Sequence, residues 1–144
     1  MDIIQKVIVL RNSKIFEELT AETLLAIAEE LEERDISEGE VIYNEGDPSD
    51  YLYIVVSGEV SLSHKQNLVL TYKEKDFFGL IALLDDSPYM ATATAASSGL
   101  LLSLDKVAFN RITDDLPEVI IAVNQILIHY LMTLLKDKYI KQNN

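Results

Sequence analysis

The residues that could catalyse a reaction or bind a metal are few in this sequence, and they do not cluster. Cysteine is absent and the only histidines are His64 and His129, whereas a metal site needs several imidazole, thiolate or carboxylate ligands together. No serine lies in a nucleophile-elbow context, and neither a P-loop nor a G-x-G-x-x-G motif occurs. Asp85 and Asp86 could hold a cation, but two acidic residues before Ser-Pro are more typical of a turn. The sequence therefore predicts no enzyme, no metal site and no cofactor.

One stretch, FGLIALLDDSPYMATATA at residues 78–95, has the pattern of a ligand cradle. Gly79 precedes a short apolar run that could be a strand or a helix. If the run is a helical turn entered through Gly79, free N–H groups near Gly79, Leu80 and Ile81 would point inward and favour an anion. Pro88 and the ATATAA run would close the other wall. The stretch itself contains no basic residue.

The elements that must position this stretch are predicted to be mainly β-strands. Residues 34–104 contain about eight short β-prone runs between turn signals, which favours an eight-stranded antiparallel β-roll or jelly roll. Residues 1–33 are predicted to be helical, with Thr20 as an N-cap, and residues 105–140 to form helices that begin after Asp105. Since no repeat or linker divides the chain, residues 1–144 are predicted to form one domain, mainly β with flanking helices.

The charge balance argues against one class of partner. The net charge is -12, from 24 acidic and 12 basic residues, and the only arginines are Arg11, Arg34 and Arg111. Binding to nucleic acid requires Lys and Arg to neutralise phosphates, so a nucleic-acid partner is not expected. No signal peptide is evident, and the lack of cysteine fits a reducing compartment, so we expect a cytoplasmic protein.

The C-terminal helix is apolar on more than one face, so it has two surfaces to cover. It could pack on the β-roll and also on a twin helix in a homodimer, on a neighbouring domain, or in a membrane. Membrane insertion is not expected, because polar residues such as Asn124 and His129 interrupt the apolar run. The predicted interface residues are Ile120, Val123, Leu127, Leu131 and Leu134.

Several motifs in a fixed order resemble one known family. The segment EGEVIYNEGDPSDYLYIVVSGEVSL is followed by DFFGLIALL, SPYMATATA and LLLSLDKVAFNRI. In these motifs and in element order, residues 12–138 resemble a cyclic nucleotide-binding domain, the β-roll module of cAMP-regulated kinases, channels and catabolite-activator-type regulators. The resemblance implies a ligand-binding cassette made of Phe78, Gly79, Leu80, Ile81, Ala82, Tyr89, Met90, Ala91 and Thr92.

Two departures from the family pattern fall on the charged positions of that cassette. The family's glutamate accepts the ribose 2′-hydroxyl and its arginine pairs with the cyclic phosphate; Leu80 and Tyr89 stand at these positions. A phosphate favours a charge-assisted, bidentate partner, which a phenol cannot replace. Losing such a partner costs about 2–5 kcal/mol, so tight binding of cAMP or cGMP is not expected. Met90 also replaces a small residue, whereas Thr92 matches the family's threonine.

Two functions remain open at this point. The domain could be a regulatory module that acts through protein contacts, or a sensor that accepts a different ligand in the cassette pocket and signals through the C-terminal helix. An open cavity flanked by Leu80, Tyr89 and Thr92 would favour the sensor, and a cavity plugged by these side chains would count against it. A DNA-reading helix-turn-helix like that of the catabolite activators is not expected, because few residues follow the long helix.

Overall fold

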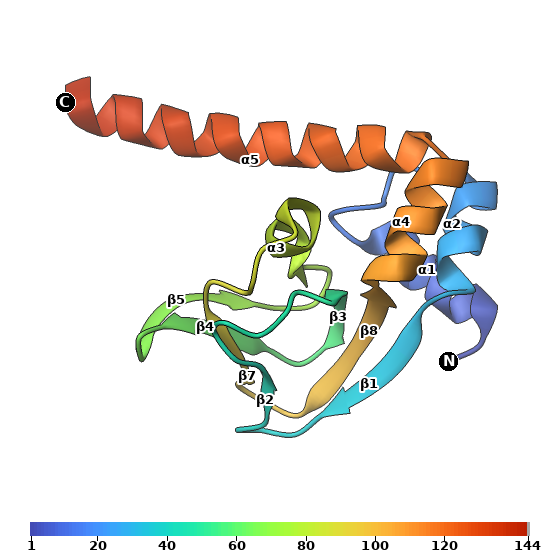
Figure 1. Ribbon diagram of the computed structural model, residues 1–144, viewed down its shortest axis with the longest axis horizontal. Helices are drawn as coiled ribbons and strands as arrows, with labels where there is room; N and C mark the ends of the chain where they lie inside the picture. The colour runs from blue at the N-terminus through green and yellow to red at the C-terminus, as the bar shows by residue number, and fades with distance from the viewer. Residues whose placement is uncertain (144) are drawn as a thin grey trace.

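Two four-stranded antiparallel sheets form the centre of the fold, which confirms the predicted β-roll (Figure 1). The computed structural model describes the backbone of residues 1–143 and the side chains of residues 1–139; Asn144, the end of the predicted domain, lies outside the described residues. One sheet has the strand order β1-β8-β3-β6 and the other β2-β7-β4-β5. The strands are β1 (Glu32–Ile36), β2 (Val41–Tyr43), β3 (Tyr51–Ser57), β4 (Val60–His64), β5 (Asn67–Tyr72), β6 (Phe77–Phe78), β7 (Thr92–Ala95) and β8 (Gly99–Asp105).

Helices precede and follow the roll in sequence, and one short helix lies within it, between β6 and β7. They are α1 (Ile3–Asn12), α2 (Ala21–Ala28), α3 (Leu80–Asp85), α4 (Lys106–Asp115) and α5 (Glu118–Asn143). The side chain of Thr20 caps α2 and that of Asp105 caps α4, as predicted, because each accepts a hydrogen bond from a first-turn N–H group. The predicted boundary between helices and roll is two residues late, since Glu32 already pairs with Ser103 of β8.

Two apolar clusters hold these layers together. One lies between the roll and the helices and contains Phe16, Phe109 and Leu80. The other lies between the two sheets and contains Tyr43 and Phe78 among its aromatic members. Because β6 and α3 are consecutive in the chain, residues 77–83 contribute to both clusters. The cassette stretch is therefore fixed to the roll on one side and to the helical layer on the other.

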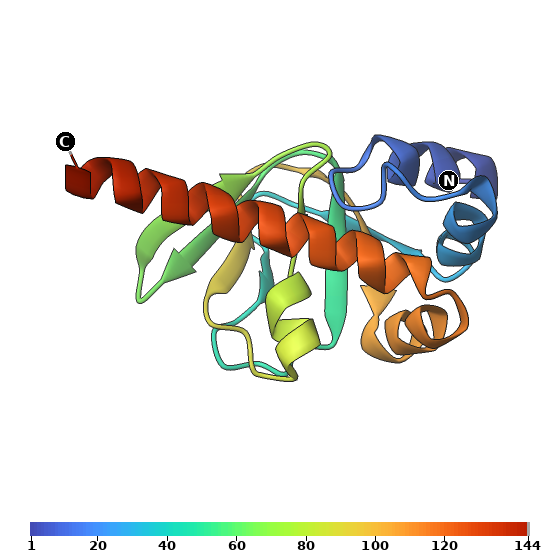
Figure 2. The same ribbon diagram turned by 90° about the horizontal axis from the view of Figure 1, so that it is seen from above.

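The long helix α5 is buried only at its start. Val119 and Val123 lie in the core against the rest of the helical layer, whereas residues 128–139 are exposed along a helix that runs above α3 and the roll (Figures 1 and 2). The prediction that Val123 lies at an interface is therefore wrong, because its side chain is fully buried within this chain. Ile120 is half-buried, whereas Leu131 and Leu134 are exposed.

Length and composition alone would allow α5 to cross a membrane. Among the described residues, Glu118–Tyr139 is the one helical segment that is long and apolar enough for this, and a single such helix is weak evidence. The expectation that α5 does not insert into a membrane stays a prediction.

A hydrogen bond ties the first turn of α5 to the start of α2. The hydroxyl of Thr20 donates to Oε1 of Glu118 at 2.8 Å. Hydrogen bonds from Thr23 and Thr20 lower the pKa of Glu118 below 4.5. A carboxyl group with a lowered pKa stabilises the fold above the pKa of the unfolded chain, and this contribution disappears as the pH falls through the folded-state pKa.

We therefore expect Glu118→Gln to melt at a lower temperature than the natural sequence at pH 7, where Glu118 is ionised in both the folded and the unfolded chain. The difference should shrink once the pH falls below the value of 4.5 that the unfolded carboxyl group has. Thermal melts of both proteins from pH 7 to pH 3 measure this. A melting-temperature difference that stays constant over that range would contradict the assigned role of Glu118.

Candidate functional site

The backbone at Gly79 determines how the cassette begins. Gly79 has φ +86° and precedes α3, so of the two alternatives left open by the sequence, strand or helix, the run is a helix entered through Gly79. A Cβ atom at this position would lie 2.7 Å from the carbonyl oxygen of Tyr51, which is closer than Cβ atoms approach other atoms. Glycine is therefore needed both for the left-handed backbone and for the close approach of β3.

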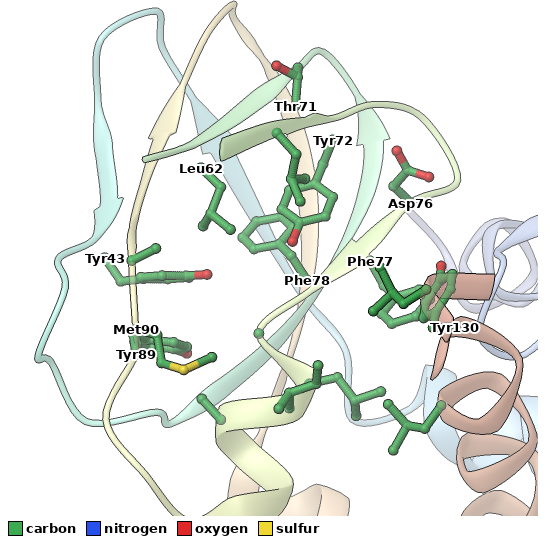
Figure 3. Close-up of a pocket in the computed structure, with 18 of the residues that line it drawn as sticks. Tyr43, Leu62, Thr71, Tyr72, Asp76, Phe77, Phe78, Tyr89, Met90 and Tyr130 are labelled. Atoms are coloured by element: carbon green, nitrogen blue, oxygen red, sulfur yellow. The ribbon is translucent and has the colours of Figure 1, made fainter. Parts of the chain in front are cut away.

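A cavity of about 550 Å³ lies beside this turn, open to solvent on one side (Figure 3). Of the predicted cassette residues, Phe78, Gly79, Leu80, Ile81, Ala82, Tyr89, Met90 and Ala91 line it. Thr92 does not, because its hydroxyl points to the β2 side and accepts a hydrogen bond from the N–H of Glu45 at 3.0 Å. The predicted stretch thus forms one wall of a real cavity.

Tyr89, at the family's arginine position, is built into the protein core. Its side chain is 5% exposed and its ring stacks on Tyr43, with ring centroids 3.6 Å apart and planes 9° apart. Its hydroxyl donates to the carbonyl oxygen of Tyr51 at 2.9 Å and accepts a hydrogen bond from the N–H of Tyr51 at 3.3 Å. Burial raises the pKa of Tyr89 to about 12, so the phenol is neutral at physiological pH. Its polar atom is thus occupied by the backbone of β3.

Leu80, at the family's glutamate position, is also a core residue. Its side chain is 2% exposed and packs in the cluster between the roll and the helices while also lining the cavity. A leucine offers no acceptor for a hydroxyl group. Leu80 and Tyr89 are therefore both uncharged side chains that pack within the fold.

The electrostatics of the cavity disfavour an anion. Asp76 is the one Asp, Glu, Lys, Arg or His side chain among the described residues that line it. Its carboxylate accepts a hydrogen bond from Nζ of Lys14 at 2.5 Å and another from the N–H of Lys73 at 2.9 Å. Because its own charge is compensated and no lining side chain is basic, the cavity offers a bound phosphate no cationic partner.

Several cavity residues were not predicted from the sequence. From the roll these are Tyr43, Leu62, Leu70, Thr71, Tyr72, Asp76 and Phe77; from α5 they are Tyr130 and Thr133. Leu127 and Leu134 of α5, predicted as interface residues, also line the cavity. The apolar alternation of the strands is a signal for inward-facing side chains, but it does not say which strands share one cavity.

The family comparison agrees with this geometry. The model of the family described as "Cyclic nucleotide-binding domain" matches residues 33–115, which is more than half of the chain. The chain belongs to the cyclic nucleotide-binding domain family. This confirms the predicted resemblance, and the matched residues include the β-roll, the cassette turn and α4.

Individual relatives of this cyclic nucleotide-binding domain are regulators. A cAMP-dependent protein kinase regulatory subunit from Hypocrea atroviridis is 38% identical over 103 residues, covering 72% of this chain and 22% of that protein. A CRP-like cAMP-activated global transcriptional regulator from Mycobacterium tuberculosis is 28% identical over 116 residues, covering 77% of this chain and 52% of that protein. This chain thus matches only about a fifth to a half of these relatives.

Solved structures show the same similarity. The regulatory domain of Toxoplasma gondii PKA, crystallised with cAMP, matches with a TM-score of 0.71 and 32% identity, covering 76% of this chain and 44% of that chain. The N-terminal domain of a transcriptional regulator from Streptomyces coelicolor matches with a TM-score of 0.76 and 27% identity, covering 90% of this chain and 94% of that one. The cyclic nucleotide-binding domain described here is therefore of a kind found in larger regulatory proteins.

Proposed function

We propose that this cyclic nucleotide-binding domain is a non-catalytic regulatory module that does not bind cAMP or cGMP tightly. The observation that carries the proposal is the position of Tyr89, whose ring is stacked on Tyr43 and whose hydroxyl is bonded to the backbone of Tyr51. The side chain that would face a cyclic phosphate is thus committed to the fold. Leu80, which also lines the cavity, has no group that could accept a ribose hydroxyl.

The absence of charged partners for a phosphate is expected to weaken the binding of a cyclic nucleotide. A charge-assisted hydrogen bond to a buried phosphate is about twice as strong as a neutral one, and removing such a partner costs about 2–5 kcal/mol. Because 1.4 kcal/mol corresponds to about a tenfold change in affinity, the loss of one partner weakens binding by tens to thousands of times. The -12 net charge of the chain adds long-range repulsion of an anion.

The exposed half of α5 supports a role in contacts with another protein surface. Its apolar side chains include Ile128, Leu131 and Leu135, each at least half exposed. An exposed apolar row of this kind is suited to packing against a second copy of the chain or against a neighbouring domain. Light scattering of the purified chain distinguishes the two partners, since a homodimer has twice the mass of the 16.2 kDa chain.

The proposal predicts the outcome of a calorimetric titration. We expect cAMP and cGMP to show no binding in the micromolar range, which would require about −8 kcal/mol. A thermal-shift measurement under the same conditions should show no stabilisation, because a ligand at a hundred times its Kd would stabilise the fold by about 2.7 kcal/mol. Micromolar or tighter binding of either nucleotide would overturn the proposal.

A further inference from the structure

The cavity remains open even though the charged cassette residues are absent. Its floor is buried and consists of Tyr43, Phe78, Leu80, Ala82 and Tyr89, and its rim is exposed at Ile81, Met90 and Leu134. A cavity of about 550 Å³ lies within the range of about 300–1,000 Å³ that is typical of sites for small molecules. The side chains of Leu80 and Tyr89 pack into the walls and leave this space unfilled.

We propose that this cavity binds a neutral, largely apolar small molecule that contains aromatic rings. The proposal rests on the proposed function in one respect, namely that a cyclic nucleotide does not occupy the site. The ligand class follows from the chemistry of the cavity walls. These walls are aromatic and aliphatic and carry one carboxylate, that of Asp76, whose charge is compensated. Apolar surface buried against such walls contributes about 25 cal/mol per Å².

The aromatic walls are fixed relative to one another. The rings of Tyr72 and Phe78 stack with centroids 5.1 Å apart, and those of Tyr53 and Phe78 with centroids 5.0 Å apart. The ring of Tyr89 stacks on the ring of Tyr43 and fixes its position. Rings packed in this way lose little conformational freedom when a ligand ring is placed against them, because their rotamers are already fixed.

Two hydroxyl groups give the cavity polar contacts without charge. The phenol oxygens of Tyr43 and Tyr72 point into the cavity (Figure 3), and neither hydroxyl is hydrogen-bonded to another described side chain or backbone group. Burial raises the pKa of Tyr72 to about 12 and raises that of Tyr43 further still. Both groups are therefore neutral donors and acceptors at physiological pH, suited to a hydroxyl or carbonyl group on an otherwise apolar ligand.

The helix α5 completes the cavity. Leu127, Tyr130 and Leu134 form the wall opposite the roll, and the ring of Tyr130 lies 6.0 Å from that of Phe77 between centroids (Figure 3). The hydroxyl of Thr133 donates to the carbonyl oxygen of His129, so its hydrogen is not free for a ligand. A molecule in the cavity would thus contact both the roll and the helix that carries the exposed apolar row.

A matched pair of fluorescent probes tests the ligand class. N-phenyl-1-naphthylamine is neutral, and 8-anilinonaphthalene-1-sulfonate has the same ring system with one added sulfonate. We expect the neutral probe to bind the full chain saturably with one site per chain, and the sulfonate at least about tenfold more weakly, because a buried sulfonate would find no cation. Equal affinity for both probes, or no saturable binding of the neutral one, would overturn the proposal.

Variants locate the binding. Leu62→Trp fills the cavity from β4 and should weaken binding of the neutral probe at least about tenfold, since the indole would occupy space that the probe needs. Leu70→Trp, from the residue opposite Leu62 on β5, should have the same effect and carries less risk to folding because Leu70 is 40% exposed. Leu68→Trp is the control, because Leu68 is exposed on the same hairpin and does not line the cavity. Unchanged binding in both cavity variants would place the probe elsewhere and overturn the proposal.

A competition experiment tests whether the hydroxyl groups of Tyr43 and Tyr72 contact the ligand. We expect 1-naphthol to displace the neutral probe at lower concentration than naphthalene, and the double change Tyr43→Phe, Tyr72→Phe to abolish that difference. A difference that persists in the double variant would refute the role of these hydroxyls. The nucleotide titration tests the proposed function separately. Tight binding of cAMP or cGMP would overturn the proposed function. If neither the nucleotides nor the neutral probe binds, only the cavity proposal is overturned.

Discussion

Replacing Tyr89 with alanine is expected to lower the free energy of unfolding by about 3–5 kcal/mol, as for other buried aromatic residues. The ring is 5% exposed and stacks on Tyr43 at 3.6 Å. The N–H and carbonyl groups of Tyr51 would also lose their hydrogen-bond partner, the phenol oxygen. Since a domain of this size is stable by about 5–15 kcal/mol, the loss is a large share of the total. Urea denaturation followed by circular dichroism measures it.

Two further variants separate the contributions of Tyr89. Tyr89→Phe keeps the stacked ring and removes the hydroxyl, so it should cost about 1–3 kcal/mol, the penalty for leaving a buried backbone group unpaired. Met90→Ala is the control, because Met90 is 68% exposed, and it should change the free energy of unfolding by less than about 0.5 kcal/mol. A cost below about 1 kcal/mol for Tyr89→Ala would refute the assignment of this residue to the core.

Replacing Gly79 with alanine is expected to destabilise the fold by about 2–5 kcal/mol in total. The left-handed backbone at φ +86° costs about 1–2 kcal/mol for a residue with a Cβ atom. The contact of 2.7 Å between that Cβ and the carbonyl oxygen of Tyr51 adds about 1–3 kcal/mol, because backbone on both sides must move. The movement would also shift α3, so binding of the neutral probe should weaken in the same variant.

Gly46 offers a control for the backbone term. Its φ is +90°, close to that of Gly79, but a Cβ atom there would meet nothing within 4 Å. Gly46→Ala should therefore cost only the conformational term of about 1–2 kcal/mol. The difference between the two variants in urea denaturation gives the cost of the close approach to Tyr51. Equal costs would contradict the inference that β3 lies too near Gly79 for a side chain.

Local chemistry explains which parts of the fold could be predicted. The caps at Thr20 and Asp105 depend on residues within one turn of each other, so they can be recognised from spacing alone. The strands were predicted for the same reason, since glycine-rich turns separate short apolar runs. The absence of charge at residues 80 and 89 was also visible in the sequence. The helical entry at Gly79 could not be recognised from spacing alone, because a short apolar run fits a strand as well as a helix.

The composition of the cavity could not be predicted in this way. Tyr43 lies on β2, which is far from α3 in the chain and reaches the cavity only through its pairing with β7 in the second sheet. Tyr72 lies on β5, close to α3 in the chain, but its place in the cavity depends on the pairing of β5 with β4. Val123 and Leu131 have the same apolar character in the sequence. Only the packing of the first turns of α5 makes Val123 a core residue and leaves Leu131 exposed. The position of the Thr92 side chain outside the cavity likewise depends on a hydrogen bond with Glu45, a residue distant in sequence.

The anchoring of α5 at one end gives it the mechanical properties of a lever. With a rise of about 1.5 Å per residue, Tyr139 lies about 24 Å along the axis from the buried Val123, which serves as the fulcrum. A rotation of about 10° at that fulcrum would displace the far end by about 4 Å, about three-quarters of the 5.4 Å pitch of a helix. Small adjustments in the cavity wall around Leu127 and Tyr130 would thus be amplified into a displacement large enough to make or break contact with another surface.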